Sequence, residues 1–115
     1  MPAYGFGSAA VFAFSTPIAV GTGTTTLVAA PGAGRNLVVQ GLIVAVTTSA
    51  AQAFDIEDGD GTIEVFKAPS SLAAGVYAVD PGVLGVALTA NTTLRYTATA
   101  GVGLTVSGFG YIREA

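Results

Sequence analysis

The chain has 115 residues, of which only 11 are charged, and its formal net charge is -3. It contains no His, Cys or Trp, so the commonest general base, thiolate nucleophiles and soft metal ligands are missing. This composition argues against an enzyme. Four scattered cations also argue against nucleic acid as a partner, because phosphate recognition needs clustered Lys and Arg.

The first 22 residues form a region without charge. They contain the aromatic residues Tyr4, Phe6, Phe12 and Phe14 among Gly, Ala and Ser. One reading is an N-terminal arm that docks on a partner through these aromatic side chains. The other is an extra strand that completes the chain's own sandwich. We therefore divide the chain into an arm, residues 1–22, and a β-sandwich domain, residues 23–115.

Pro17 and Gly21 interrupt the early apolar run, and no basic region precedes it. We expect neither a secretory signal nor a membrane partner. Beyond residue 22, turn residues separate short runs rich in Val, Thr, Ile, Leu and Tyr, and no window has helical periodicity. The pattern predicts an all-β sandwich or barrel. Eight strands after an N-terminal arm fit an eight-stranded antiparallel jelly-roll sandwich, although other eight-stranded sandwiches share this strand count and spacing. The expected strands are 24–30, 36–48, 52–58, 62–67, 75–80, 84–90, 93–99 and 103–112.

Three of these strands indicate where the core lies. Strand 93–99 alternates apolar residues with Thr and Arg, which is typical of a half-buried strand. Strand 36–48 is apolar on both faces. Either a neighbouring subunit covers its second face, or a bulge at Gly41 exchanges the two faces along the strand. In strand 103–112 we predict a bulge at Gly108, because Leu104 and Phe109 differ in parity.

Five of the seven carboxylates lie within ten residues, from Asp55 to Glu64. A tight hairpin at Gly59-Asp60 would place Asp55 opposite Glu64 and put Phe54, Ile56, Ile63 and Val65 on one face. The acidic face is read as a solvated surface, as a docking patch for a basic partner through Asp55, Glu57 and Glu64, or as a calcium site. The spacing of the acids does not match the EF-hand calcium loop, so we predict no metal site. The acids alternate along one short hairpin instead of converging in a cleft, as those of a glycosidase would, so we also predict no catalytic residue. We predict no cofactor.

The segment from Thr25 to Gly41, TTLVAAPGAGRNLVVQG, resembles one found in small capsid decoration, or cement, proteins of tailed bacteriophages. The resemblance continues loosely through the Gly/Ala/Thr/Val-rich run 97–111 and spans roughly residues 24–112. It implies a homotrimer on the outer surface of an icosahedral virion, which is assembled in the host cytoplasm. Such a trimer would bridge neighbouring subunits of the major capsid protein. The low charge, which weakens repulsion between copies, independently predicts self-association.

A second hypothesis belongs to a different class of function. Jelly rolls also occur as carbohydrate-binding or receptor-binding modules, here a module of a phage fibre, which bind sugars through exposed aromatic residues. Tyr77, Tyr96 and Tyr111 are the candidates for such a platform. The absence of Trp counts against it.

Overall fold

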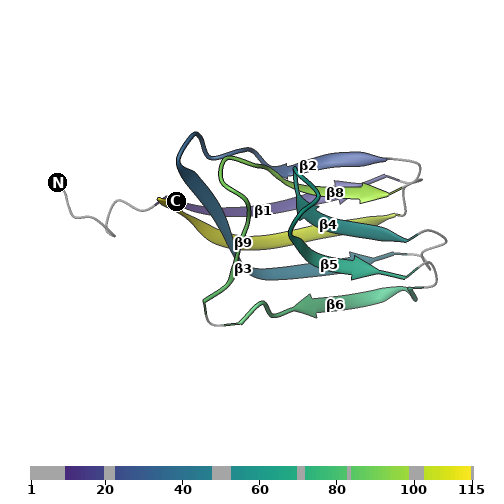
Figure 1. The fold of residues 1–115 in the computed structure, drawn as a ribbon. Helices are drawn as coiled ribbons and strands as arrows, with labels where there is room; N and C mark the ends of the chain where they lie inside the picture. The colour runs from purple at the N-terminus through teal and green to yellow at the C-terminus, as the bar shows by residue number, and fades with distance from the viewer. Residues whose placement is uncertain are drawn as a thin grey trace.

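The structure, a computed structural model, describes residues 10–19, 23–47, 53–69, 72–82, 84–98 and 103–114. In these residues the chain forms nine strands in two antiparallel sheets, which face each other as a sandwich (Figure 1). The predicted all-β antiparallel sandwich is confirmed. None of the described residues belongs to a helix long and apolar enough to cross a membrane.

The five-stranded sheet has the order β1 (Val11–Ile18), β9 (Leu104–Glu114), β3 (Arg35–Val46) and β6 (Gly75–Val79), and the short β7 (Val86–Ala87) also pairs with β3. The four-stranded sheet has the order β2 (Thr24–Val28), β8 (Leu94–Ala98), β4 (Phe54–Asp58) and β5 (Glu64–Ala68). Figure 1 shows both sheets with their strands in these orders from top to bottom.

The strand pairs are nested around one hairpin. Strand β1 pairs with β9, β2 with β8, β3 with β6, and β4 with β5 in the middle of the chain. Successive pairs alternate between the two sheets. This is the arrangement of a jelly roll, in which a long folded hairpin wraps into two layers. The two ends of the described chain therefore lie together in one sheet, and the acidic hairpin lies in the other.

The expected count of eight strands is wrong, because nine are present. The additional strand is β1, which pairs with β9 over eight residues. For residues 11–18 the second of our two readings, an extra strand that completes the sandwich, is therefore confirmed. The expected strand 84–90 is reduced to the two residues of β7. Residues 1–9, which include Tyr4 and Phe6, lie outside the described residues. A docking role for them stays a prediction.

Strand β3 contains the bulge that was one of our two explanations for its apolar faces. Its register with β9 shifts between Val39 and Gly41. Before the shift Leu37 and Val39 enter the core, and after it the core residues are Leu42, Val44 and Val46. Ile43 then points outward and is 48% exposed. Both faces of β3 are thus apolar, but within this chain only one of them packs into the sandwich core.

The predicted bulge at Gly108 is wrong. The register of β9 with β1 runs without interruption from Leu104 to Tyr111. The extra residue lies in β3 instead, so β9 needs no bulge of its own. Leu104 and Val106 enter the core, whereas Phe109 is 54% exposed on the other face.

Two glycines of β9 make room for aromatic side chains of β1. Phe12 lies opposite Gly110 and Phe14 opposite Gly108. A Cβ atom at Gly110 would overlap the backbone oxygen of Val38 and the ring of Phe12, and one at Gly108 would lie 2.9 Å from the ring of Phe14. Aromatic rings placed over glycines in this way restore the apolar contact that glycine lacks. The aromatic residues of β1 thereby fasten this edge strand to the sheet.

Aromatic side chains of the four-stranded sheet contribute to the core between the sheets. The ring of Phe54 lies 5.5 Å from that of Tyr96 and 5.8 Å from that of Phe66. Tyr96 and Leu94 are fully buried, which confirms the predicted inward face of strand 93–99. Tilted ring pairs at these distances add about 0.5–1.5 kcal/mol each beyond their area burial.

Candidate functional site

The acidic hairpin β4–β5 has a different register from the one that we predicted. Asp55 lies opposite Lys67, and Phe54 lies opposite Ala68. The predicted pairing of Asp55 with Glu64 is therefore wrong, and the residue opposite Glu64 is Glu57. A register shift between Ile56 and Glu57 separates the two halves of the hairpin. Apolar parity alone did not reveal this, because the bulge lets Val65 and Phe66 both pack against the core.

The turn of this hairpin is wider than the two-residue turn predicted, and the Asp58 side chain is the reason. Its Oδ1 atom accepts hydrogen bonds from the backbone amides of Thr62, at 2.9 Å, and Ile63, at 3.3 Å. The backbone amide of Asp58 donates to the carbonyl oxygen of Ile63. A carboxylate that binds amides four and five residues ahead requires a longer loop than Gly59-Asp60 alone supplies.

Asp58 also ties the hairpin to the segment after β7. Its Oδ2 atom accepts hydrogen bonds from the hydroxyl of Thr89, at 2.6 Å, and from the backbone amide of Thr89, at 3.2 Å. The residue is 0% exposed. Burial by itself raises the pKa of the Asp58 carboxyl, but the hydrogen bonds from Thr89, Thr62 and Ile63 outweigh it and hold that pKa below its ordinary value. The ionised carboxylate is therefore part of the fold.

The buried role of Asp58 was not predicted from the sequence. We treated the carboxylates as one outward face, although Asp58 shares its parity with Phe54 and Ile56, which are buried. This shared parity was the signal in the sequence that Asp58 faces inward. An ionised side chain at an inward position requires several donors, and Thr89 comes from a distant part of the sequence.

Glu57 and Arg95 form the most buried ion pair in the described part of the chain. They lie directly opposite each other on β4 and β8. The Glu57 Oε2 atom accepts from Arg95 Nη2 at 2.7 Å and from Nε at 3.1 Å. The Glu57 side chain is 9% exposed and that of Arg95 is 30% exposed. This pair neutralises the carboxylate that faces Glu64 across the hairpin.

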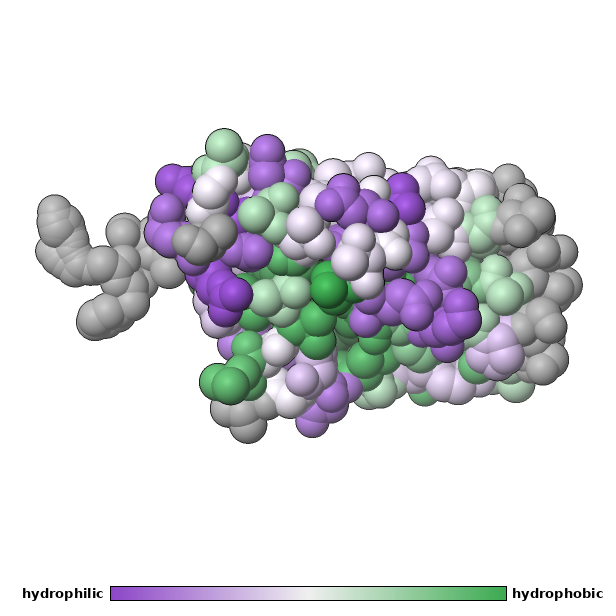
Figure 2. Space-filling view, viewed as in Figure 1, coloured by the Kyte–Doolittle hydropathy of each residue, from purple (hydrophilic) through white to green (hydrophobic). Residues whose placement is uncertain are grey.

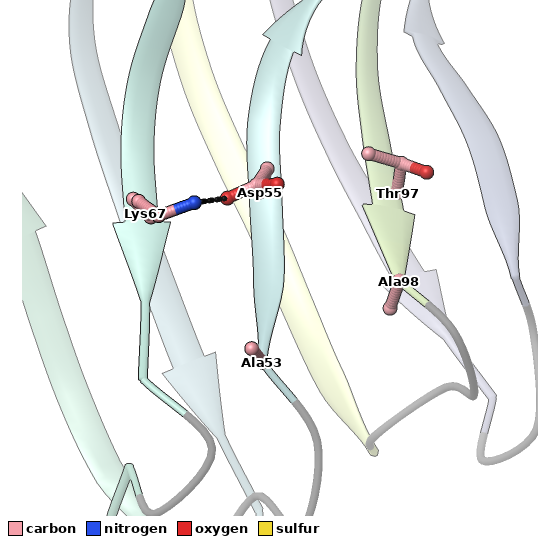
Figure 3. Close-up of a pocket in the computed structure, with 5 residues that line it drawn as sticks. All are labelled: Ala53, Asp55, Lys67, Thr97 and Ala98. Carbon is pink, nitrogen blue, oxygen red and sulfur yellow. Dashed lines mark hydrogen bonds and ion pairs between the residues drawn. The ribbon is translucent and has the colours of Figure 1, made fainter.

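Lys67 pairs with the two remaining carboxylates of the hairpin face. Its Nζ atom lies 3.3 Å from Asp55 Oδ1 and 3.6 Å from Glu64 Oε2. The hydrogen bond to Asp55 and the charges of both carboxylates raise the pKa of the Lys67 ammonium. Figure 3 shows Lys67 and Asp55 joined across the hairpin, beside a shallow depression lined also by Ala53, Thr97 and Ala98. No aromatic side chain lines this depression.

The three acids do come close together. Carboxylate oxygens of Asp55, Glu57 and Glu64 all lie within 4.8 Å of one another. Oxygen ligands of this kind suit calcium. However, Lys67 and Arg95 already place two positive charges on the cluster, and a cation would have to compete with them. The geometry therefore favours a salt-bridged surface over a metal centre.

The other residues predicted for partner binding lie in different places. Phe12 and Phe14 point toward the interior and pack against the core. Tyr96 is fully buried on β8, Tyr77 packs inward from β6, and Tyr111 lies on β9. These three tyrosines do not share a face, so they do not form the platform that sugar binding would need.

The side of the molecule shown in Figure 2 carries mixed chemistry. Hydrophilic residues, in purple, cover much of this side, and an apolar area, in green, lies in its lower middle. The view matches Figure 1, in which β5 and β6 lie along the lower part of the two sheets. Polar groups on this side are thus interrupted by an apolar area.

Comparison with known proteins gives a match in structure but none in sequence. No protein-family model matches the chain, and no curated protein sequence is matched significantly. Among solved structures, a chain of the cyanophage Pam1 capsid asymmetric unit is similar in fold, with a TM-score of 0.53 and 17% sequence identity. The match covers 96% of this chain and 90% of that chain. The chain therefore shares its whole sandwich architecture with a protein of a phage capsid.

Proposed function

We propose that this protein is a structural component of a phage virion, and specifically a decoration or cement protein on the outside of the capsid. The observation that carries the proposal is the likeness in fold to a chain of the Pam1 capsid asymmetric unit over nearly the full length of both chains. The resemblance of residues 25–41 to cement proteins supports the finer assignment. A role in shell stability requires no catalytic group, which agrees with the absence of His and Cys.

In this proposal the protein forms a homotrimer that bridges neighbouring subunits of the major capsid protein. Three weak contacts held in one rigid trimer act at high effective concentration, so avidity exceeds one contact by roughly 10² to 10⁴-fold. The trimer binds the assembled shell better than separate subunits, and it therefore stabilises the shell by mass action. The sandwich supplies the rigidity that this mechanism needs.

Two surfaces are assigned to contact with the capsid. The first is the N-terminal arm, in which Tyr4 and Phe6 make the contact while Phe12 and Phe14 anchor β1 to the sandwich. The second is the acidic hairpin, where the exposed Glu64 and the partly exposed Asp55 face a basic surface of the partner. Glu57 contributes by holding Arg95 in place.

A binding experiment tests the proposal. The purified protein is mixed with shells assembled from the major capsid protein encoded in the same genome, and the shells are pelleted. We expect the protein to sediment with assembled shells and not with unassembled subunits, and to raise the temperature at which the shells break. A protein that stays in the supernatant at saturating concentration contradicts the proposal.

A truncation tests the role of the arm in the same assay. Deleting residues 2–9 leaves β1 intact, so we expect normal folding and weaker sedimentation with shells. Deletion through residue 14 is not equivalent, because it removes half of β1. Binding of a glycan by the full chain, with no affinity for shells, would favour the carbohydrate-binding or receptor-binding module instead.

A further inference from the structure

The outer face of the five-stranded sheet carries a broad uncharged area, which ends at Arg113, two residues beyond Tyr111 on β9. Four rows of outward-facing residues cross this sheet, and they begin in β1 at Val11, Ala13, Ser15 and Pro17. Each row continues through β9 to β3, and two of them reach β6. Val38, where the first row meets β3, is already covered within this chain, with 1% exposed. All residues of these rows are described, and none is charged. We refer to these four rows as the neutral sheet face.

This face also holds most of the exposed large hydrophobic side chains. Val11 is 80%, Val76 72%, Phe109 54% and Ile43 48% exposed, and all four belong to the neutral sheet face. Only one further exposed large hydrophobic residue, Leu84, occurs among the described residues, and it lies in the loop before β7. Soluble monomers rarely expose several large apolar residues on one continuous surface.

Phe109 extends this apolar surface across two strands. It lies opposite Gly41 on β3, and a Cβ atom at Gly41 would overlap its ring. The ring therefore lies over the glycine and covers β3 as well as β9. A flat surface of rings, methyl groups and small hydroxyl side chains is suited to contact with another flat surface.

The distribution of charge indicates which partner fits this face. The opposite sheet carries Asp55, Glu57, Glu64, Lys67 and Arg95 on its outward side. Two copies of a chain with net charge -3 repel each other least where neither contributes charge to the contact. A strongly charged partner would gain nothing from the neutral sheet face. A second copy of this chain fits it best.

The area of the neutral sheet face is close to that of a small specific contact. Strands about 4.8 Å apart with a rise of about 3.3 Å per residue, counted as eight residues on each of β1, β9 and β3 and five residues on β6, give a projected area of roughly 460 Å². Two such faces bury roughly 900 Å² in total, which is close to the lower bound of about 1,000 Å² for a biological interface. Side-chain relief adds to this projected value.

We infer that the neutral sheet face is the surface through which copies of this chain contact one another. The inference rests on the proposed homotrimer and assigns its interface. Three copies turn this face toward a common axis, and the central strands β9 and β3 lie nearest to it. Ile43, Ser107 and Phe109 then approach their own counterparts in the neighbouring copies.

A charge placed on this face tests the inference. We compare the unaltered chain with Ile43→Glu and with the control Thr26→Glu, which adds the same charge at an exposed position of β2. Sedimentation velocity should show a trimer for the unaltered chain and for Thr26→Glu. For Ile43→Glu we expect a folded monomer and at least a 100-fold weaker association. A monomeric unaltered chain, or an Ile43→Glu variant that remains trimeric, would overturn the inference.

A second measurement does not depend on a disruptive variant. Because the chain has no Cys, a single Ser107→Cys substitution places one thiol on the neutral sheet face. Mild oxidation should produce a covalent dimer from Ser107→Cys and none from the control Thr26→Cys. Cross-linking through Thr26→Cys alone would show that copies meet through the opposite sheet, and the inference would be wrong.

Shell binding separates this inference from the proposed function. If the unaltered protein is a trimer through this face but does not bind shells, the interface stands and the virion role fails. If it binds shells as a monomer, the virion role stands and the interface fails. An Ile43→Glu variant that keeps its trimeric mass but loses shell binding would assign the face to the capsid protein instead.

Discussion

The two outer faces of the sandwich are held in place by different interactions. On the four-stranded sheet, ion pairs join neighbouring strands, with Arg95 bonded to Glu57 and Lys67 to Asp55. On the five-stranded sheet, the neutral sheet face carries no charge, and the ring of Phe109 on β9 lies over Gly41 on β3. Most of the few charged residues of this chain therefore lie on the four-stranded sheet. The five-stranded sheet is left with a largely apolar outer face.

Replacing Gly110 by Ala tests the matching by shape and has the largest expected effect. Gly110 lies on the inner side of the same sheet, where a Cβ atom would overlap the backbone oxygen of Val38 and the Phe12 ring. We expect a loss of about 3 kcal/mol in the free energy of unfolding, measured by urea denaturation. The control is Gly23→Ala, whose Cβ would lie 3.6 Å from the Ala98 oxygen, an ordinary contact. Similar stability of the two variants would contradict the shape argument.

Replacing Asp58 by Asn tests the buried carboxylate that anchors the charged sheet. The amide keeps the size of the side chain but loses the charge-assisted hydrogen bonds from Thr89, Thr62 and Ile63. We expect a loss of about 2 kcal/mol at neutral pH. Asp60→Asn in the same turn is the control, because Asp60 is exposed and should change stability by less than about 0.5 kcal/mol.

The contribution of the Asp58 carboxylate to the free energy of unfolding should depend on pH. The pKa of Asp58 is lower in the folded chain than in the unfolded chain. Its contribution is therefore fully present above the ordinary aspartate pKa and is lost as the pH falls below that value toward the folded-state pKa. The stability gap between the unaltered chain and Asp58→Asn should narrow in acid. A gap that stays constant from neutral pH to about pH 2 would show that the charge has no role.

Replacing Arg95 by Met tests the ion pair between β4 and β8. The change leaves the nearly buried Glu57 carboxylate without its partner, and we expect a loss of about 1–2 kcal/mol. Adding Glu57→Gln to the same chain should recover part of this loss. Arg35→Met is the matched control, because its partner Glu114 is 82% exposed and the pair contributes little. Equal losses in both single variants would contradict the distinction that burial makes.

Replacing Asp55 by Asn and Glu64 by Gln together tests the exposed part of the acidic hairpin and has the smallest expected effect. Both carboxylates pair only with the exposed Lys67, so stability should change by less than about 0.5 kcal/mol. Reduced sedimentation with shells, at unchanged stability, would support the docking role. A calcium-dependent rise in the melting temperature of the unaltered chain, lost in this variant, would instead identify a metal site.

Local patterns predicted some elements well and others poorly. The alternation around Leu94 and Tyr96 identified the inward face of β8, because only one side of this strand is apolar and only that side can face the core. The hairpin register could not be fixed in this way, since a bulge allows Val65 or Phe66 to face inward. For strand β1 the sequence left two readings open, an extra strand of the sandwich and a docking arm, because its aromatic residues suit both equally well. Its partner, β9, lies at the other end of the sequence.

The sequence by itself determined the fold class, the low surface charge and the concentration of acids in one hairpin, since these follow from composition, alternation and turn residues. Only the tertiary structure decided where the bulge in β3 lies, which strand covers Gly108 and Gly110, and which cation neutralises each acid. These features depend on contacts between residues far apart in the chain. Asp58 illustrates the difference. In the sequence it is one of several acids in a hairpin, whereas in the structure it is a buried carboxylate that accepts a hydrogen bond from the distant Thr89.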